Sequence, residues 1–134
     1  MKGTYILVIF LKEDCKIEIG SLGKIFFSKG YYLYVGSAMG NYGSATLINR
    51  VKRHILDSKY KKLHWHIDYL LDNPNSILIK IYFIPSSNSY ECKLAEEILL
   101  CSSNYIENFG SSDCLCKSHL LYFKRFSVLN SQFL

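Results

Sequence analysis

A chain of 134 residues is long enough for one folded domain and leaves little room for a second. Its hydrophobic content of 49% excludes a disordered chain, and its net charge of +5 argues only weakly for an anionic partner. Because no apolar run approaches the roughly 18 residues of a membrane span and no signal-peptide pattern opens the chain, we expect a cytoplasmic protein without a membrane partner.

The first half of the chain predicts strands followed by a helix. Residues 4–11 are rich in β-branched and aromatic side chains, which favours a buried strand. A short strand is expected at 16–19 and a longer one at 31–37, ahead of a glycine-rich loop. Ser44 is the predicted N-cap of a helix over 45–57.

Side-chain spacing divides this helix into faces. Arg53 lies nearly opposite the apolar face at about 100° per residue, so we expect it to point to solvent. Arg50 and His54 are four residues apart and share a face at the edge of the apolar one, from which both can reach a common site. The expected buried face consists of Leu47, Ile48, Val51 and Ile55.

The second half predicts a short helix, a strand and a longer helix. Residues 64–71 favour the short helix, and 76–84 form the clearest strand after the first. Asn88 and Glu91 have the spacing of a capping box, which predicts a helix that continues to about Cys101.

These elements predict a single domain over residues 1–134. Its core is expected at 3–102, and a C-terminal tail, 103–134, is expected to pack on that core. Within the tail, 119–126 is a last strand or a docked extended segment. The fold class is α/β (α+β), a small and mainly antiparallel β-sheet flanked by helices.

Basic side chains gather between positions 50 and 66. Such clustering is the electrostatic footprint of a protein that binds a phosphate backbone, although an ordinary solvated helix face gives the same pattern. No helix is patterned for contacts with base edges, so we expect recognition of backbone and shape. The candidate nucleic-acid-binding residues are Gly36, Ser37, Lys52, Arg53, Lys61, Lys62, His64 and His66.

Two tripeptides stand at strand ends. Gly3-Thr4-Tyr5 opens the first strand, and Tyr34-Val35-Gly36 closes a later strand just before the basic helix. That helix contains Arg50-Val51-Lys52-Arg53-His54, an arginine followed by an apolar residue and then by a histidine four positions after the arginine. This order resembles the GIY-YIG nuclease superfamily, with Thr4 and Val35 in place of its two isoleucines.

The resemblance implies a divalent-metal-dependent endonuclease that acts in repair or processing of DNA, with DNA favoured over RNA. Glu91 would hold one Mg²⁺ or Mn²⁺ ion, and Arg50 would hold the phosphoryl oxygens. Tyr5 or Tyr34 would orient or deprotonate the attacking water, and His54 is the other candidate acid or base. Glu96 and Glu97 are the alternatives to Glu91, while Asn104 and Asn108 are the candidates for a late superfamily asparagine.

The pattern is similar in more detail to an archaeal-type branch of that superfamily, found alone or fused to an endonuclease III-like glycosylase. A glycosylase-type repair partner is therefore a candidate. The residues that carry this resemblance are Tyr34-Val35-Gly36-Ser37, Arg53-His54, His64-Trp65-His66-Ile67-Asp68-Tyr69, Phe109-Gly110-Ser111-Ser112-Asp113-Cys114, Cys116 and Ser118-His119-Leu120.

Cys114, Cys116 and His119 form a C-x-C-x2-H cluster. Their spacing is tighter than that of most zinc sites, so buried reduced thiols are favoured over structural zinc, for which Cys92 or His66 would be the fourth ligand. An odd cysteine count also argues against a disulfide framework. Two alternatives to the nuclease remain, a non-catalytic nucleic-acid-binding module on the same fold and a small metal-binding interaction protein organised by this cluster.

Overall fold

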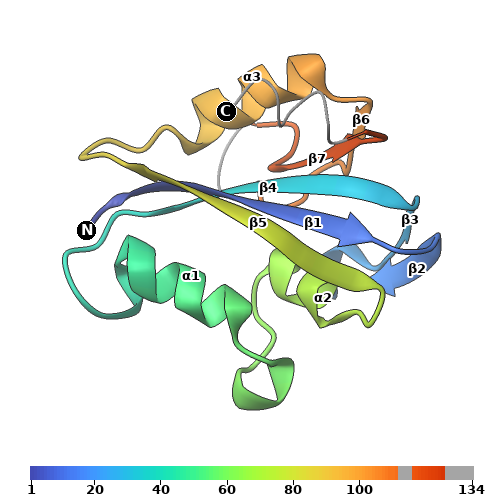
Figure 1. Ribbon diagram of the computed structural model, residues 1–134, viewed down its shortest axis with the longest axis horizontal. Helices are drawn as coiled ribbons and strands as arrows, with labels where there is room; N and C mark the ends of the chain where they lie inside the picture. Colours follow the sequence, from blue (N-terminus) through green and yellow to red (C-terminus); the bar gives the residue numbers. More distant parts are fainter. Residues whose placement is uncertain (112–115, 126–134) are drawn as a thin grey trace.

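A five-stranded antiparallel sheet in the spatial order β5-β1-β4-β7-β6 forms the centre of the computed structural model, which describes residues 1–111 and 116–125 (Figure 1). A two-stranded sheet pairs β2 with β3. The predicted α+β class with a mainly antiparallel sheet is therefore confirmed. The strands are β1 Gly3–Leu11, β2 Cys15–Glu18, β3 Lys24–Phe27, β4 Gly30–Ala38, β5 Ser76–Pro85, β6 Asn104–Tyr105 and β7 Leu120–Phe123.

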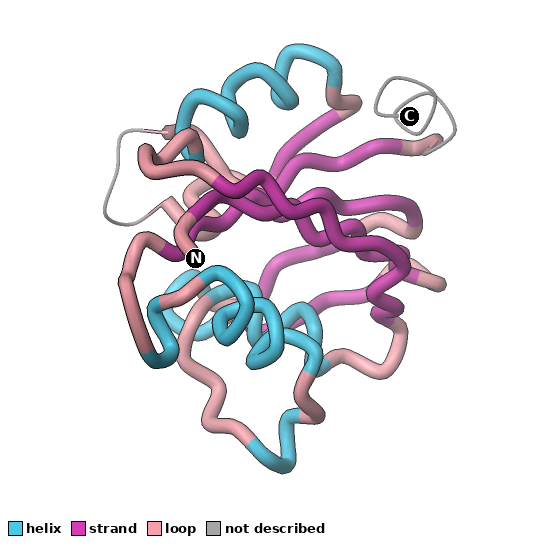
Figure 2. The backbone as a smooth tube through the Cα atoms, turned by 60° about the vertical axis from the view of Figure 1, so that its left-hand side comes forward, coloured by secondary structure: helices cyan, strands magenta, loops and turns pink. Residues whose placement is uncertain are grey.

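Helices lie on both faces of the larger sheet (Figures 1 and 2). The helices α1 (Leu47–Ile55) and α2 (His66–Asp72) cover one face, and α3 (Glu91–Cys101) covers the other. Among the described residues, no helix is long and apolar enough to cross a membrane. Short 3₁₀ segments occupy Gly20–Leu22, Gly43–Ala45 and Ser58–Tyr60.

Strand β1 is buried on both faces, which explains its nearly continuous run of apolar residues. Successive side chains of a strand point to opposite faces. Tyr5, Leu7 and Ile9 join the core that contains residues of α1 and α2, whereas Ile6 and Val8 join the core beneath α3. All five are at most 2% exposed, so β1 separates two cores.

The pairing of β1 with β4 brings the two tripeptides together. Tyr5 lies opposite Gly36, and Leu7 lies opposite Tyr34. A Cβ atom at Gly36 would come within 2.4 Å of the Tyr5 ring, so the glycine makes room for that ring. The absent side chain of Gly36 therefore serves packing within the protein, and its contact with nucleic acid stays a prediction.

The N-termini of two helices differ from the prediction. Thr46, rather than Ser44, caps α1, and its side chain accepts a hydrogen bond from the Asn49 amide over 3.4 Å. Helix α3 has Tyr90 as its N-cap without a side-chain cap. The predicted capping box of Asn88 and Glu91 is thus wrong, and the Glu91 carboxylate is turned to other partners.

The buried face of α1 also differs from the expected stripe. Leu47, Val51 and His54 are buried, whereas Ile48 is 41% and Ile55 is 60% exposed. At about 100° per residue, the buried three cluster around one direction and the two isoleucines lie roughly a quarter-turn away. The polar His54 therefore takes a core position that residue type alone would assign to Ile55.

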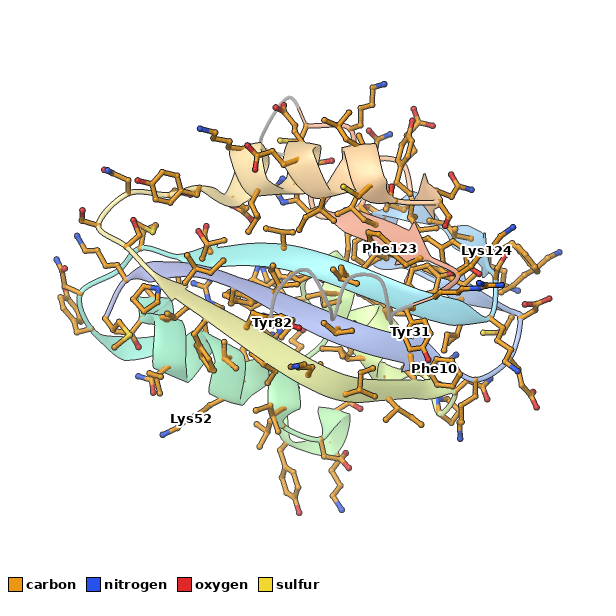
Figure 3. The ribbon with its side chains drawn as sticks, turned by 45° about the horizontal axis from the view of Figure 1, so that its top comes forward. Phe10, Tyr31, Lys52, Tyr82, Phe123 and Lys124 are labelled. Carbon is orange, nitrogen blue, oxygen red and sulfur yellow. The ribbon has the colours of Figure 1, made fainter. Side chains whose placement is uncertain are left out.

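The C-terminal segment completes the sheet. Strand β7 pairs with β4, and β6 pairs with β7, so the described residues of this segment join the larger sheet. Phe123 of β7 lies opposite Tyr31 of β4, and both are labelled in Figure 3. Cys114 of the C-x-C-x2-H cluster falls outside the described residues.

Replacing Gly36 by alanine should lower the free energy of unfolding by about 1–3 kcal/mol, because the new Cβ overlaps the Tyr5 ring. Urea unfolding measures the change. The same replacement in a Tyr5→Ala background should cost clearly less, since the overlapping ring is gone. Equal costs in the two backgrounds would contradict this account of Gly36.

Candidate functional site

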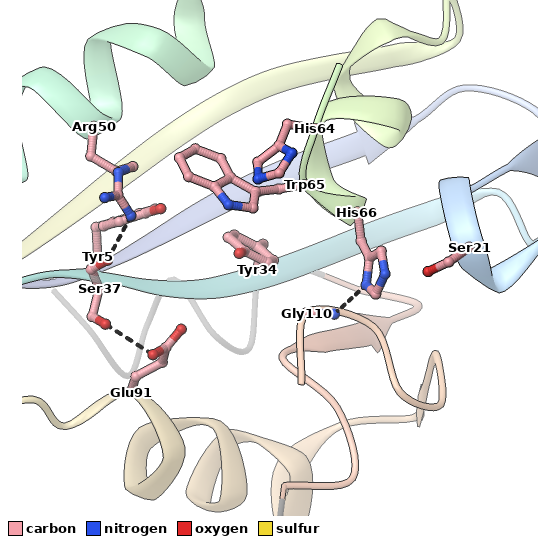
Figure 4. A pocket seen from close by; sticks show the side chains of 10 residues that line it. All are labelled: Tyr5, Ser21, Tyr34, Ser37, Arg50, His64, Trp65, His66, Glu91 and Gly110. Atoms are coloured by element: carbon pink, nitrogen blue, oxygen red, sulfur yellow. Dashed lines mark hydrogen bonds between the residues drawn. The ribbon is translucent and has the colours of Figure 1, made fainter. Parts of the chain in front are cut away.

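A pocket of about 430 Å³ opens where the two tripeptides meet (Figure 4). It brings together four of the five predicted catalytic residues and three of the predicted nucleic-acid contacts, from parts of the chain far apart in sequence. The fifth catalytic candidate, His54, lies buried behind Tyr5. The lining residues are Tyr5, Ser21, Tyr34, Ser37, Arg50, His64, Trp65, His66, Glu91 and Gly110.

Glu91 contributes the carboxylate of this pocket from the first turn of α3. Its Oε2 accepts a hydrogen bond from the Ser37 hydroxyl over 2.9 Å, and its Oε1 lies 3.1 Å from Nδ1 of His119. Glu96 and Glu97 are exposed and line a different hollow with residues of the same helix. The structure thereby separates Glu91 from its two rivals.

Arg50 reaches the pocket from the edge of the buried face of α1, as its helical position predicts. Its Nε donates to the Ser44 carbonyl over 3.1 Å, and its Nη1 donates to the Ser37 carbonyl over 3.3 Å. Its guanidinium carbon lies 4.6 Å from the centre of the Trp65 ring. These contacts fix the guanidinium beside the pocket, and a guanidinium has five N–H donors.

Tyr5 and His54 form a buried hydrogen bond of 2.6 Å between the phenol oxygen and Nε2. Burial lowers the pKa of His54 to about 3, against the opposing charge of Asp68 and with help from Lys61. The imidazole is therefore neutral near pH 7, and in the tautomer that carries its proton on Nδ1 its Nε2 accepts the hydrogen bond that the Tyr5 hydroxyl donates. Within the described residues, Nδ1 of His54 has no hydrogen-bond partner.

The two tyrosines of the pocket are protonated phenols near neutral pH. Burial raises the pKa of Tyr5, and the Arg50 charge only partly offsets it. Burial also raises the pKa of Tyr34 well above its ordinary value. The two rings lie 6.4 Å apart, centre to centre. Both groups are therefore suited to hydrogen bonding and proton relay rather than to action as resident phenolate bases.

The two histidines that the sequence left inseparable have different surroundings. His66 accepts a hydrogen bond at Nδ1 from the Gly110 amide over 2.8 Å, which leaves its Nε2 to carry the proton when the ring is neutral. Burial lowers the pKa of His66, which favours that neutral form. His64 is exposed at the pocket rim, with its ring 5.7 Å from that of Trp65.

Arg53 corrects a prediction, because it does not point freely to solvent. Its guanidinium binds both carboxylate oxygens of Asp68 at 2.8 and 3.0 Å and lies 4.4 Å from the centre of the Trp65 ring. A long side chain lets a residue opposite the buried face of α1 reach back to α2. Arg53 is therefore engaged within the protein and is a poor candidate for nucleic-acid contact.

Asp68, the partner of Arg53, was not predicted from the sequence as a site residue. Its side chain is fully buried and also accepts hydrogen bonds from the backbone amides of His64 and Trp65, at 2.8 and 2.9 Å. Burial alone would raise the pKa of Asp68, but these hydrogen bonds and Arg53 outweigh it, so the pKa lies below its usual value. The carboxylate thus holds the start of α2 against α1.

The remaining basic candidates divide into two groups. Lys61 donates from Nζ to the carbonyls of Arg53 and His54, at 3.1 and 3.2 Å, and so caps the end of α1. Lys52 and Lys62 are exposed, and Lys52 extends away from the sheet in Figure 3. Lys61 is therefore a structural residue, while Lys52 and Lys62 stay available to an anionic partner.

Sequence reasoning missed Trp65, Ser21 and Gly110 as pocket residues. Trp65 was named only within the segment His64-Trp65-His66-Ile67-Asp68-Tyr69, where its position between two histidines was the one available signal. Ser21 and Gly110 lie in connections whose course depends on tertiary contacts. Neither Asn104 nor Asn108 is among the residues that line the pocket, so among the described residues no late asparagine joins the site.

Comparison with known proteins identifies one family. The family model described as "Domain of unknown function DUF123" matches residues 4–133, which is nearly the whole chain. No curated protein and no solved structure matches the chain significantly.

Replacing Asp68 by asparagine should lower the free energy of unfolding by about 3 kcal/mol near neutral pH, because Arg53 loses its buried counter-charge. The folded-state pKa of Asp68 is depressed, so its stabilising contribution is complete above the unfolded pKa of about 4 and is lost as pH falls through the folded value. Urea unfolding across this range should show the wild type and the variant converging only in acid.

Asp72→Asn is the matched control, since Asp72 is exposed on the same helix. It should change stability by less than about 0.5 kcal/mol. A cost in Asp68→Asn as small as that of the control would contradict the role given to this carboxylate.

Proposed function

We propose that this chain, which belongs to the DUF123 family, is a divalent-metal-dependent endonuclease of the GIY-YIG type that hydrolyses phosphodiester bonds in DNA repair or processing. One observation carries the proposal. Tyr5, Tyr34, Arg50 and Glu91 come from β1, β4, α1 and α3 and line one pocket. Unrelated surface residues rarely bring two phenols, a guanidinium and a carboxylate into one concave site.

Arg50 is the group that would bind the scissile phosphate. Phosphodiester hydrolysis builds negative charge on the non-bridging oxygens, and a planar guanidinium binds two such oxygens at once. Contacts with Ser37, Ser44 and Trp65 hold the side chain in place before substrate arrives. This preorganisation spares the reaction the cost of ordering a long side chain.

The oxygen donors beside Arg50 suit one hard divalent cation. Mg²⁺ is held in proteins by one or two carboxylates and keeps several waters, which fits the Glu91 carboxylate with the neighbouring Ser37 hydroxyl. A bound Mg²⁺ or Mn²⁺ would supply Lewis-acid stabilisation of charge on the leaving oxygen. The side chain of Glu91 is 26% exposed and is therefore accessible to an ion from solvent.

Tyr5 and His54 supply a path for a proton. The attacking water must lose a proton as its oxygen bonds to phosphorus and the bond to the leaving oxygen breaks. The Tyr5 oxygen can accept a hydrogen bond from that water while it donates its own proton to Nε2 of His54. A bound phosphate adds negative charge nearby, which raises the proton affinity of the imidazole.

A second candidate function, a non-catalytic nucleic-acid-binding module, is favoured by a different observation. Both carboxylate oxygens of Glu91 already have partners, Ser37 and His119, so the carboxylate is satisfied without an ion. A pocket with a fixed arginine would still bind a phosphate backbone. Cleavage assays separate this module from the enzyme.

Glu91→Gln should reduce Mg²⁺-dependent cleavage of a labelled DNA panel by about 100-fold or more, because the neutral amide removes the charge that would hold the ion. The panel contains single strands, duplex, nicked duplex, flaps, forks and abasic duplex. Arg50→Lys should cause a loss of similar order, since a lysine cannot bind two phosphoryl oxygens as a fork.

Glu96→Gln and Glu97→Gln are the matched controls on the same helix and should cleave like the wild type. A wild type that binds every substrate and cleaves none, with Mg²⁺ or Mn²⁺, would replace the nuclease by the binding module. Equal cleavage by wild type and Glu91→Gln would point to a contaminating nuclease and contradict the site.

Lys52→Ala and Lys62→Ala should each reduce the slope of log affinity against log salt concentration by about 1, because each removes one phosphate contact. Fluorescence anisotropy with a duplex at several salt concentrations measures the slope. Lys12→Ala, an exposed lysine at the far end of β1, is the control and should leave it unchanged. Unchanged slopes in both variants would remove these lysines from the interface.

A further inference from the structure

We infer that Cys92, Cys116 and His119 form a zinc site next to Glu91. One ligand atom from each of the three residues lies within 4.8 Å of the other two. The residues come from two places far apart in sequence, the first turn of α3 and the segment that enters β7. Tertiary folding brings them together, and none of them is among the residues that line the pocket described above.

The spacing of the ligand atoms approaches that of a tetrahedral zinc site. Zn–S bonds of about 2.3 Å and Zn–N bonds of about 2.0 Å place sulfur and nitrogen about 3.5 Å apart, and two sulfurs about 3.8 Å apart, at the tetrahedral angle. The Sγ atom of Cys92 lies 3.7 Å from Nε2 of His119. Every pair lies within 4.8 Å, so closure by no more than roughly 1.3 Å brings the three atoms to this spacing.

The orientation of His119 suits a zinc ligand. Its Nδ1 lies 3.1 Å from Oε1 of Glu91, so the ring proton belongs on Nδ1, facing the carboxylate. Nε2 then presents its lone pair on the side of Cys92. A histidine that ligates zinc through one nitrogen and donates to a carboxylate through the other is the usual arrangement around protein zinc.

The backbone holds His119 in this position independently of any ion. Its amide donates to the Phe109 carbonyl over 2.8 Å, and its carbonyl accepts from the Val35 amide over 2.9 Å. His119 is 2% exposed and Cys116 is 8% exposed. Cys92 is partly exposed. A mostly buried cluster of two thiols and an imidazole is a soft donor set, which selects zinc over Mg²⁺.

A zinc ion here would tie the segment before β7 to the first turn of α3. It would also restrict the movement of the Glu91 carboxylate, because Oε1 of Glu91 contacts the ring of the ligating His119. A structural zinc takes four ligands, so one further group would join the three protein ligands. The inference stands whether or not the pocket cleaves DNA, because zinc content and cleavage are measured separately.

Metal analysis of the full chain, purified under reducing conditions without added chelator, should find about one zinc per chain. Replacement by Co²⁺ should give thiolate-to-cobalt charge-transfer absorption and the d–d bands of a tetrahedral site. Cys92→Ser and Cys116→Ser should each lose the metal. The controls Cys15→Ser and Cys101→Ser, which alter free thiols, should keep it.

A Cys92→His variant distinguishes a ligand from a residue needed only for folding. It should retain one metal per chain and lose about half of the charge-transfer intensity, since one of two thiolates is replaced by imidazole. Glu91→Gln should retain zinc while losing cleavage, which separates the two proposals. A folded wild type with no zinc and no Co²⁺ charge-transfer band, or with Cys92 and Cys116 joined in a disulfide, would overturn the zinc site.

Discussion

The antiparallel pairing of β1 with β4 is the constraint on which the pocket depends. It sets Tyr5 opposite Gly36, and the missing side chain of that glycine leaves room for the phenol ring. Burial of β1 between two cores fixes this register, because a shift by one residue would turn every apolar side chain to the wrong core. The two tripeptides therefore depend on each other, because the Tyr5 ring of the first occupies the space beside Gly36 of the second.

The buried carboxylate of Asp68 helps to position Arg50, although the two residues are not in direct contact. Asp68 binds the guanidinium of Arg53 and the backbone amides at the start of α2. The same turn carries Trp65, whose ring contacts both Arg53 and Arg50. By holding this turn, Asp68 positions Trp65, and the Trp65 ring in turn packs against Arg50.

Local patterns in the sequence were sufficient for β1, β2, β4 and β5, but they did not predict β3 or β6. Strand β1 follows from its composition, and Arg50 follows from helical spacing combined with the tripeptides. The errors concern long side chains and helix ends. Arg53 and Lys61 find partners on other segments, while Thr46 and Tyr90 replace the expected caps. Those choices depend on distances across the fold, which local spacing does not contain.

The cluster of Cys92, Cys116 and His119 also depends on distances across the fold that local spacing does not contain. It lies next to Glu91. Spacing along the chain identified the C-x-C-x2-H segment and left Cys92 and His66 as alternatives for a further ligand. The structure brings Cys92, from a helix that starts more than twenty residues earlier, to Cys116 and His119. Glu91 therefore lies between the pocket and the cysteine cluster. One carboxylate oxygen contacts Ser37 at the pocket, and the other contacts His119 of the cluster. A positive ion bound to His119 would draw electron density from the imidazole and strengthen the attraction between its Nδ1 and Oε1. If both proposed metal sites are filled, Oε2, which faces Ser37, would be the oxygen left to a hard cation in the pocket.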